Sequence, residues 1–171
     1  IDPGVRDIAL DPALFTCLSC GEGEYQVIIG DGRLKLAEVE EATFDVIVLD
    51  AFGSDSIPIH LLTSEAIDLF MSRLKSDGTL IVHISNRHID LEPVLGRYAR
   101  ERKLPARTCL RAASTVIQQA QGQRPTHAVV ISRSRRLISQ LEERNGWQLP
   151  RSDTALWTDS YSSILDVLKF E

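Results

Sequence analysis

Blocks of apolar residues alternate along the chain with amphipathic blocks, in the order typical of an α/β domain. Phe44 to Leu49 is almost continuously apolar, which predicts a strand buried on both faces of a sheet. Thr79 to Ile84 and Thr126 to Ser132 predict further strands. The segment from Thr63 to Lys75 carries an apolar stripe at helical spacing, and Ser76-Asp77-Gly78 predicts its end.

The same reasoning predicts the remaining elements. Two are strands, at Tyr25–Gly30 and Pro105–Ala112, and five are helices, at Val5–Leu14, Arg33–Glu41, Leu91–Lys103, Arg135–Asn145 and Ser162–Phe170. Strands that alternate with helices indicate βαβ units and a mostly parallel sheet with flanking helices. Ligands of such sheets bind outside the carboxyl ends of the strands, so the polar residues there are the first candidates for a site.

Asp31 lies between Gly30 and Gly32 at the end of the predicted strand 25–30. The glycines allow a ligand to approach the backbone closely. The carboxylate of Asp31 could accept a hydrogen bond from an exocyclic amine while a neighbouring N–H donates to a ring nitrogen, which would recognise the edge of an adenine. Asp31 could equally cap the helix that begins near Arg33, and the spacing leaves both interpretations open.

Asp50 ends the apolar strand 44–49, and Asp55 follows it in a loop that continues to Pro58. Two carboxylates could bind an ammonium group and accept its proton if they lie within hydrogen-bonding reach. The alternative is that both satisfy backbone N–H groups of the loop. We favour the functional interpretation for Asp50 more than for Asp55. We expect His83, inside an apolar strand, to be a satisfied core residue.

Composition narrows the class of protein. The chain has 171 residues, of which 43% are hydrophobic and 25% charged, as expected for one globular domain. A net charge of −5 argues against a nucleic-acid partner. Cys17 and Cys20 form a C-x-x-C pair without a second pair, so we expect no metal site. No apolar run could span a bilayer and no signal peptide is present, so we expect a cytoplasmic location.

Six sequence motifs add a family resemblance. They are Asp2-Pro3 after an isoleucine, GDGR at 30–33, FDVIVLDAF at 44–52, SDSIPIHLLTSEA at 54–66, DGTLIVHISNRHIDLEPV at 77–94 and WTDSY at 157–161. In combination they resemble the spermidine synthase family. The likeness is greatest to the spermidine synthase-like domains of bacteria that are often fused to membrane transporter-like segments, and it covers residues 1–171 as a single domain.

The resemblance implies a Rossmann-like fold of the class I S-adenosylmethionine methyltransferase type. It also implies polyamine biosynthesis, in which an aminopropyl group passes from decarboxylated S-adenosylmethionine to putrescine without a metal. Asp50 would be the catalytic base, and Asp55 would help to hold the amine. Asp31 and Gly32 would contact the adenine, Asp2 would lie at the strand end whose acids bind the ribose, and Pro58 would flank the methylthioadenosine part.

The chain departs from the family pattern in two places. The loop places two more residues between Asp50 and Asp55 than typical synthases have, and Phe52 is bulky where the family has a small polar residue. The family's first strand, its Gly-rich turn and most of its second strand would precede Ile1. We therefore expect a partial, N-terminally truncated domain. An unpaired strand edge at 25–30 would favour a homodimer, and the parent protein could carry fused membrane segments.

Three functions remain open from the sequence. The first is an aminopropyltransferase with Asp50 as general base. The second is an S-adenosylmethionine-dependent methyltransferase, because the two co-substrates differ only by a carboxylate, whose binding segment would precede Ile1. The third is a non-catalytic nucleoside-binding domain of a larger, membrane-associated protein.

Overall fold

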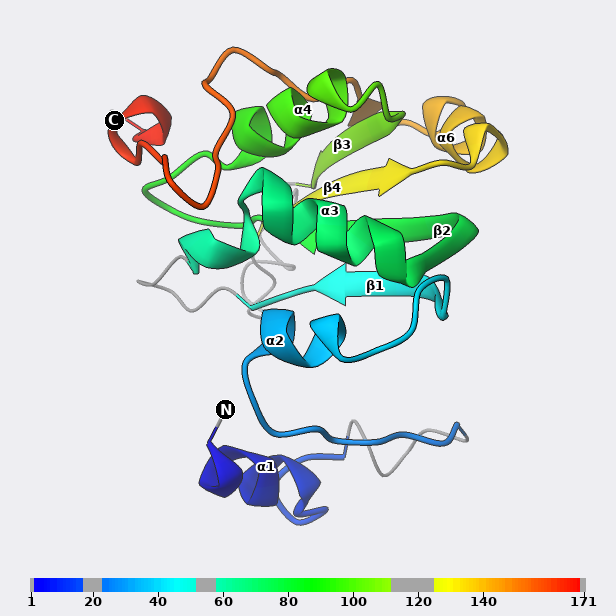
Figure 1. Cartoon of the computed structure of the whole chain (residues 1–171), viewed down its shortest axis with the longest axis vertical. Coiled ribbons are helices and arrows are strands. Elements are labelled where there is room, and N and C mark those ends of the chain that lie inside the picture. The colour runs from blue at the N-terminus through cyan, green and yellow to red at the C-terminus, as the bar shows by residue number, and fades with distance from the viewer. Residues whose placement is uncertain (1, 17–22, 52–57, 112–124, 170–171) are drawn as a thin grey trace, which may run out of the picture. The chain divides into compact units, whose positions relative to one another are not determined.

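The structure is a computed structural model that describes residues 2–16, 23–51, 58–111 and 125–169 (Figure 1). The chain divides into two compact units, residues 1–39 (unit 1) and residues 40–171 (unit 2), and each is described by itself. Within the described residues, no helix combines the length and apolar character needed to cross a bilayer.

Unit 1 contains two short helices, α1 (Pro3–Leu10) and α2 (Gly32–Ala37). Both confirm predicted helices, although each ends earlier than expected. None of the described residues of unit 1 is buried. The strand predicted at 25–30 is wrong: these residues make no backbone pairing with any part of the chain that the structure describes. β-branched residues favour an extended backbone, but a strand also requires a neighbour that supplies hydrogen bonds.

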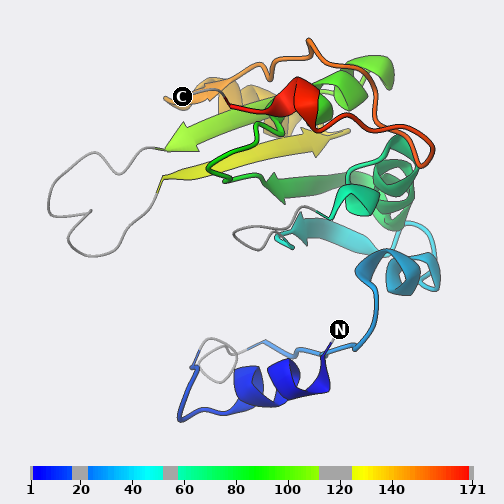
Figure 2. The same ribbon diagram turned by 90° about the vertical axis from the view of Figure 1, so that its left-hand side faces the viewer.

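Unit 2 is built on a five-stranded sheet in the order β1-β2-β4-β3-β5. The strands are β1 (Phe44–Leu49), β2 (Leu74–His83), β3 (Ala106–Arg111), β4 (Thr126–Ser132) and β5 (Trp147–Gln148). β1 and β2 are parallel, whereas β4 lies between β2 and β3 and is antiparallel to both (Figure 2). The predicted α/β class with flanking helices is confirmed. The described sheet itself is mixed, because the hydrophobic pattern predicts strands but not their relative directions.

Two helices cover one face of this sheet, α3 (Ser64–Arg73) and α4 (Glu92–Glu101) (Figure 1). The strand residues beneath them, Leu80, Val82, Val129 and Ile131, are completely buried. The third helix, α6 (Arg135–Glu142), packs against β3, β4 and β5. Two 3-10 turns complete the unit, η1 (Ile59–Leu61) and η2 (Leu165–Val167), and the second replaces the helix predicted at 162–170.

The expectation that residues 44–49 are buried on both faces is wrong. Val46 and Val48 are 50% and 61% exposed, while Ile47 and Leu49 between them are half-buried. Side chains alternate between the two faces of a strand, and β1 is the edge strand of the described sheet. One face of β1 packs inward and the other stays open.

Candidate functional site

The parallel strands β1 and β2 end side by side and bring two polar residues together. Leu49 of β1 lies in register with Val82 of β2, so Asp50 and His83 follow at neighbouring positions of the same edge. The Oδ1 atom of Asp50 lies 2.8 Å from Nδ1 of His83. Both side chains are accessible to solvent. The sheet therefore presents a carboxylate–imidazole pair at the edge where open α/β sheets bind ligands.

A second hydrogen bond fixes the ring of His83 from its other side. Nε2 of His83 lies 2.6 Å from Oγ of Ser85, and the same Oγ accepts a hydrogen bond of 2.7 Å from the backbone N–H of His127. An ionised carboxylate only accepts, so Nδ1 of His83 must carry a proton toward Asp50. In a neutral ring, Nε2 then accepts from the hydroxyl of Ser85. The network thus assigns one tautomer and one orientation to His83.

This arrangement leaves part of the Asp50 carboxylate available. His83 engages Oδ1, and Oδ2 has no hydrogen-bond partner in the described part of the chain. A carboxylate oxygen held in a fixed orientation can accept a hydrogen bond from an amine and then take its proton. Asp50 follows directly after β1, as the sequence predicted; its role in binding a ligand stays a prediction.

The interpretation of His83 as a core residue is wrong. Its ring is only half-buried and turns toward the sheet edge, where it contacts Asp50 and Ser85. The sequence shows an apolar run before Asp50 and another before His83. The two runs form the parallel strands β1 and β2, so the residues at their ends meet. Recognising this required the register of the two strands, which the hydrophobic pattern does not supply.

In unit 1, both predicted cofactor-binding acids cap helices. Oδ1 of Asp31 accepts a hydrogen bond of 3.0 Å from the backbone N–H of Leu34, so the capping role that the sequence left open is present. Asp2 caps α1 through a bond of 2.7 Å from the N–H of Gly4. Gly32 begins α2, and a Cβ built there would meet nothing within 4 Å, so the backbone at this position is open to close approach.

The remaining predicted residues lie in or beside the loop after β1. Pro58 is half-buried and precedes η1, where its carbonyl accepts a hydrogen bond of 2.9 Å from the N–H of Leu61. Asp55 and Phe52 lie outside the described residues, as do Cys17 and Cys20. In the described ranges, no group of three or more His, Cys, Asp or Glu side chains could hold a metal ion.

The WTDSY motif at 157–161 has a structural role in unit 2. Trp157 is completely buried, and its carbonyl accepts a hydrogen bond of 2.8 Å from the N–H of Ser64. The hydroxyl of Thr63 donates to Asp159 over 2.7 Å. The motif therefore anchors the N-terminus of α3, which follows the loop that begins at Asp50.

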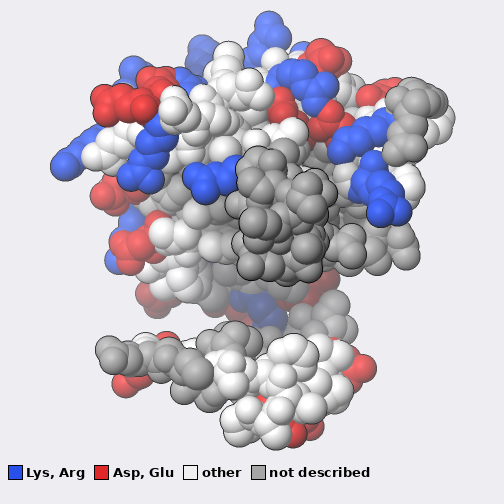
Figure 3. Space-filling model, turned by 180° about the vertical axis from the view of Figure 1, so that it is seen from behind, with Lys and Arg blue, Asp and Glu red and all other residues white. Residues whose placement is uncertain are grey.

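Charge is not concentrated on the face of the molecule seen in Figure 3. There, Lys and Arg side chains are interspersed with Asp and Glu. The described residues on this face form no continuous basic patch of the kind that tracks a nucleic-acid backbone.

Comparisons with solved structures identify the fold. A probable spermidine synthase from Corynebacterium glutamicum matches with a TM-score of 0.52 and 17% identity, over 81% of this chain and 55% of that one. Spermidine synthase from Thermotoga maritima matches with a TM-score of 0.54 and 17% identity, over 94% of this chain and 52% of that one. The chain has a spermidine synthase-like fold.

A third spermidine synthase was solved in complex with the transition-state analogue AdoDATO. It matches this chain with a TM-score of 0.55 and 18% identity, over 94% of this chain and 53% of that one. The chain thus spans about half the length of the structures it matches. No family model and no curated protein sequence matches it. The resemblance drawn from the sequence motifs is confirmed at the level of the fold.

Proposed function

We propose that this domain transfers an aminopropyl group from decarboxylated S-adenosylmethionine to a small amine such as putrescine, with Asp50 as general base. The observation that carries the proposal is the Asp50–His83 pair at the carboxyl ends of two parallel strands. The spermidine synthase-like fold supports the choice of reaction.

The chemistry requires a proton acceptor beside the attacking amine. The amine nitrogen attacks the methylene carbon bonded to the sulfonium sulfur. A C–N bond forms, the C–S bond breaks with its electron pair passing to sulfur, and methylthioadenosine leaves. The new ammonium group then loses a proton. Oδ2 of Asp50 would accept the N–H hydrogen bond and take that proton, while His83 holds Oδ1 and keeps the carboxylate oriented.

The nucleoside part would be held by residues carried over from the family resemblance. Asp31 and Gly32 would contact the adenine, Asp2 would serve the ribose and Pro58 would flank the methylthioadenosine moiety, with Asp55 on the amine side. A cytoplasmic location, a homodimer and fusion to membrane segments remain predictions of the sequence.

The test is release of methylthioadenosine by the full-length protein from decarboxylated S-adenosylmethionine and putrescine, run beside a methyl-transfer assay with S-adenosylmethionine. Asp50→Asn should lower kcat by about 100-fold or more, the usual contribution of a general base. Asp45→Asn is the matched control, because Asp45 lies on the same strand and pairs with Lys75 away from the pair. Equal turnover by wild type and Asp50→Asn would contradict the base assignment. Methyl transfer alone would contradict the reaction.

His83 acts through Asp50 and is therefore a positioning residue. His83→Ala should lower kcat by about tenfold while changing KM little, and it should alter the shape of the pH–rate profile. His83→Gln, whose amide can still donate to Asp50, should recover part of the loss. A profile of unchanged shape in His83→Ala would limit the histidine to a packing role.

A further inference from the structure

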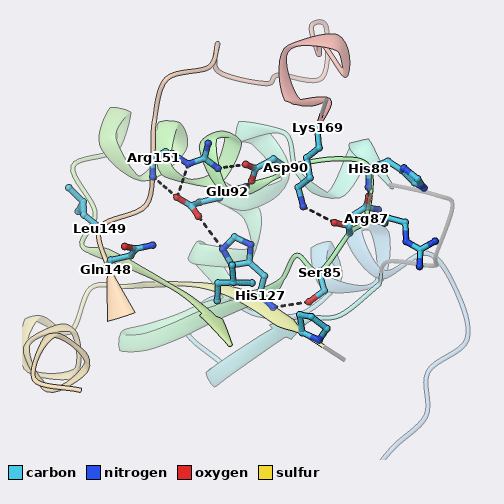
Figure 4. A pocket seen from close by; sticks show the side chains of 13 residues that line it. Ser85, Arg87, His88, Asp90, Glu92, His127, Gln148, Leu149, Arg151 and Lys169 are labelled. Carbon is cyan, nitrogen blue, oxygen red and sulfur yellow. Dashed lines mark hydrogen bonds and ion pairs between the residues drawn. The ribbon is translucent and has the colours of Figure 1, made fainter. Parts of the chain in front are cut away.

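Unit 2 contains a cavity of about 1040 Å³ that Ser85 lines, and Asp50 and His83 are not among its lining residues. It is lined by the loop after β2, the N-terminus of α4, the end of β3, the start of β4, β5 with the segment after it, and the C-terminal segment (Figure 4). The lining includes Arg87, Glu92, His127, Arg151 and Lys169.

A buried acid–histidine pair forms the inner wall of the cavity. Glu92 and His127 have side chains only 7% and 13% exposed, and their Oε2 and Nε2 atoms are 3.1 Å apart. Burial alone would raise the pKa of Glu92. Hydrogen bonds from His127 and from the backbone of Arg151, with the charges of both residues, lower that pKa to about 2. Glu92 is therefore ionised at neutral pH.

The orientation of His127 follows from its partner. Nε2 of His127 lies between Oε2 of Glu92 and the hydroxyl oxygen of Thr108, which is 2.9 Å away and itself donates to the carbonyl of Ala128. Because the carboxylate only accepts, Nε2 carries the proton. Nδ1 then remains as the ring's second polar atom, and it has no hydrogen-bond partner among the described residues. Nδ1 of His127, on the wall of the cavity, is therefore available to form a hydrogen bond with a ligand.

The two acids that line the cavity are both neutralised by the protein itself. Arg151 forms an ion pair with Asp90 through Nη2 and lies 3.3 Å from Oε1 of Glu92 through Nε. Its backbone N–H donates to the same Oε1 over 2.8 Å. Figure 4 shows the guanidinium of Arg151 against both carboxylates. Neither acid is left to attract a cationic ligand.

Two further cations of the lining have no acidic partner. Lys169 donates through Nζ to the carbonyl of Asn86 over 2.8 Å, and Arg87 forms no ion pair with any described residue. Exposed apolar side chains, Leu110 and Leu149, complete the lining. The cavity thus combines excess positive charge with an apolar wall, in a chain whose net charge is −5.

We propose that this cavity binds a small organic anion, a carboxylate or phosphate ester carried on an apolar group. Arg87 and Lys169 attract the anionic group, His127 hydrogen-bonds a polar atom of the ligand, and the apolar wall contacts its hydrocarbon part. The site is separate from Asp50 and does not depend on the aminopropyl transfer proposed above.

The test is titration of the full chain with phenyl phosphate, phenylacetate and inorganic phosphate, followed by calorimetry and by the imidazole NMR signals of His127. Phenethylamine, a cation of similar size, is the control ligand. We expect both aromatic anions to bind more tightly than inorganic phosphate and phenethylamine, and to shift the His127 signals. The comparison of phenyl phosphate with phenylacetate distinguishes a phosphate site from a carboxylate site.

Each matched variant replaces two exposed, positively charged side chains with glutamine. The double variant Arg87→Gln/Lys169→Gln should weaken binding of the anions by about tenfold. Arg135→Gln/Arg136→Gln removes the same charge from exposed positions of α6 outside the cavity lining and should leave binding unchanged. Thermal unfolding checks that both variants are folded. Absence of binding, equal binding of phenethylamine, or equal losses in the two double variants would overturn the proposal.

Discussion

Unit 1 and unit 2 both contain helices with apolar side chains, but these side chains are buried only in unit 2. Phe15 in unit 1 is 52% exposed, whereas Phe70 of α3 in unit 2 is 1% exposed. Both units contain helices with N-caps, but among the described residues only unit 2 has a sheet for its helices to cover. Periodicity specifies which side of an element is apolar, while burial depends on a second element that faces it.

The largest expected difference between the units comes from truncating these two phenylalanines. Phe70→Ala should lower the free energy of unfolding by about 3–5 kcal/mol, because it removes a buried ring and leaves a cavity. Phe15→Ala should lower it by less than about 0.5 kcal/mol, as at exposed sites without special contacts. Chemical denaturation measures both. Similar losses would show that the exposure difference between the units does not hold in solution.

The second prediction concerns acid stability. Because the pKa of Glu92 is about 2 in the folded chain, against an ordinary value of 4.5, its ionised form stabilises the fold above about pH 5. That contribution, on the order of 3 kcal/mol, is lost as the pH falls toward 2.

Glu92→Gln should therefore flatten the dependence of unfolding free energy on pH between about 5 and 2. Glu38→Gln is the control from unit 1, since Glu38 forms only an exposed ion pair with Lys35. Its pH profile should follow that of the wild type. If the free energy of unfolding falls equally steeply between pH 5 and pH 2 in Glu92→Gln and in the wild type, ionised Glu92 does not stabilise the fold.

The third prediction compares two glycines in helices. A Cβ at Gly96 of α4 would lie 1.8 Å from the carbonyl oxygen of Arg151, so Gly96→Ala must displace the segment that crosses the helix. We expect a loss of about 1–3 kcal/mol. Gly32→Ala in α2 meets open space and should be neutral or stabilising by up to about 1 kcal/mol. Thermal unfolding distinguishes the two, and equal effects would refute the close approach at Gly96.

The smallest expected difference comes from the helix caps. Thr63→Ala removes the hydroxyl that accepts from the N–H of Ala66 and donates to Asp159, both at the N-terminus of α3. Asp31→Ala removes the cap of α2. We expect a loss of about 1–2 kcal/mol for Thr63→Ala and about 0.5 kcal/mol for Asp31→Ala in urea denaturation. A larger effect at Asp31 would mean that unit 1 contributes more to the stability of the chain than its exposed side chains indicate.

The sequence predicted most of the elements of unit 2 and the position of Asp50. The limits of β1 and β4 and the cap of α3 agree with the prediction, because they depend on local periodicity and capping chemistry. The failures concern relations between distant segments. Residues 25–30 pair with no strand in the part of the chain that the structure describes, Val46 and Val48 are exposed, and His83 meets Asp50 only through the register of two strands.

The cavity was not predicted from the sequence. Its Glu92–His127 pair joins a helix to a strand from distant parts of the chain. Neither residue has a neighbour in sequence that would indicate its partner. Such contacts depend on strand order, and the placement of β4 between β2 and β3 could not be read from hydrophobic spacing.

One hydroxyl group of unit 2 contacts both the Asp50–His83 pair and a residue of the cavity wall. Oγ of Ser85 is hydrogen-bonded to the ring of His83 and accepts a hydrogen bond from the backbone N–H of His127. Thermodynamic linkage requires that any free energy passed between two binding sites be equal in both directions. A ligand that binds in the cavity and repositions Ser85 would change the affinity of a second ligand for the place beside Asp50. The second ligand would then change the affinity of the first for the cavity by the same factor. Ser85→Ala, which removes this hydroxyl, would test whether the two places are coupled.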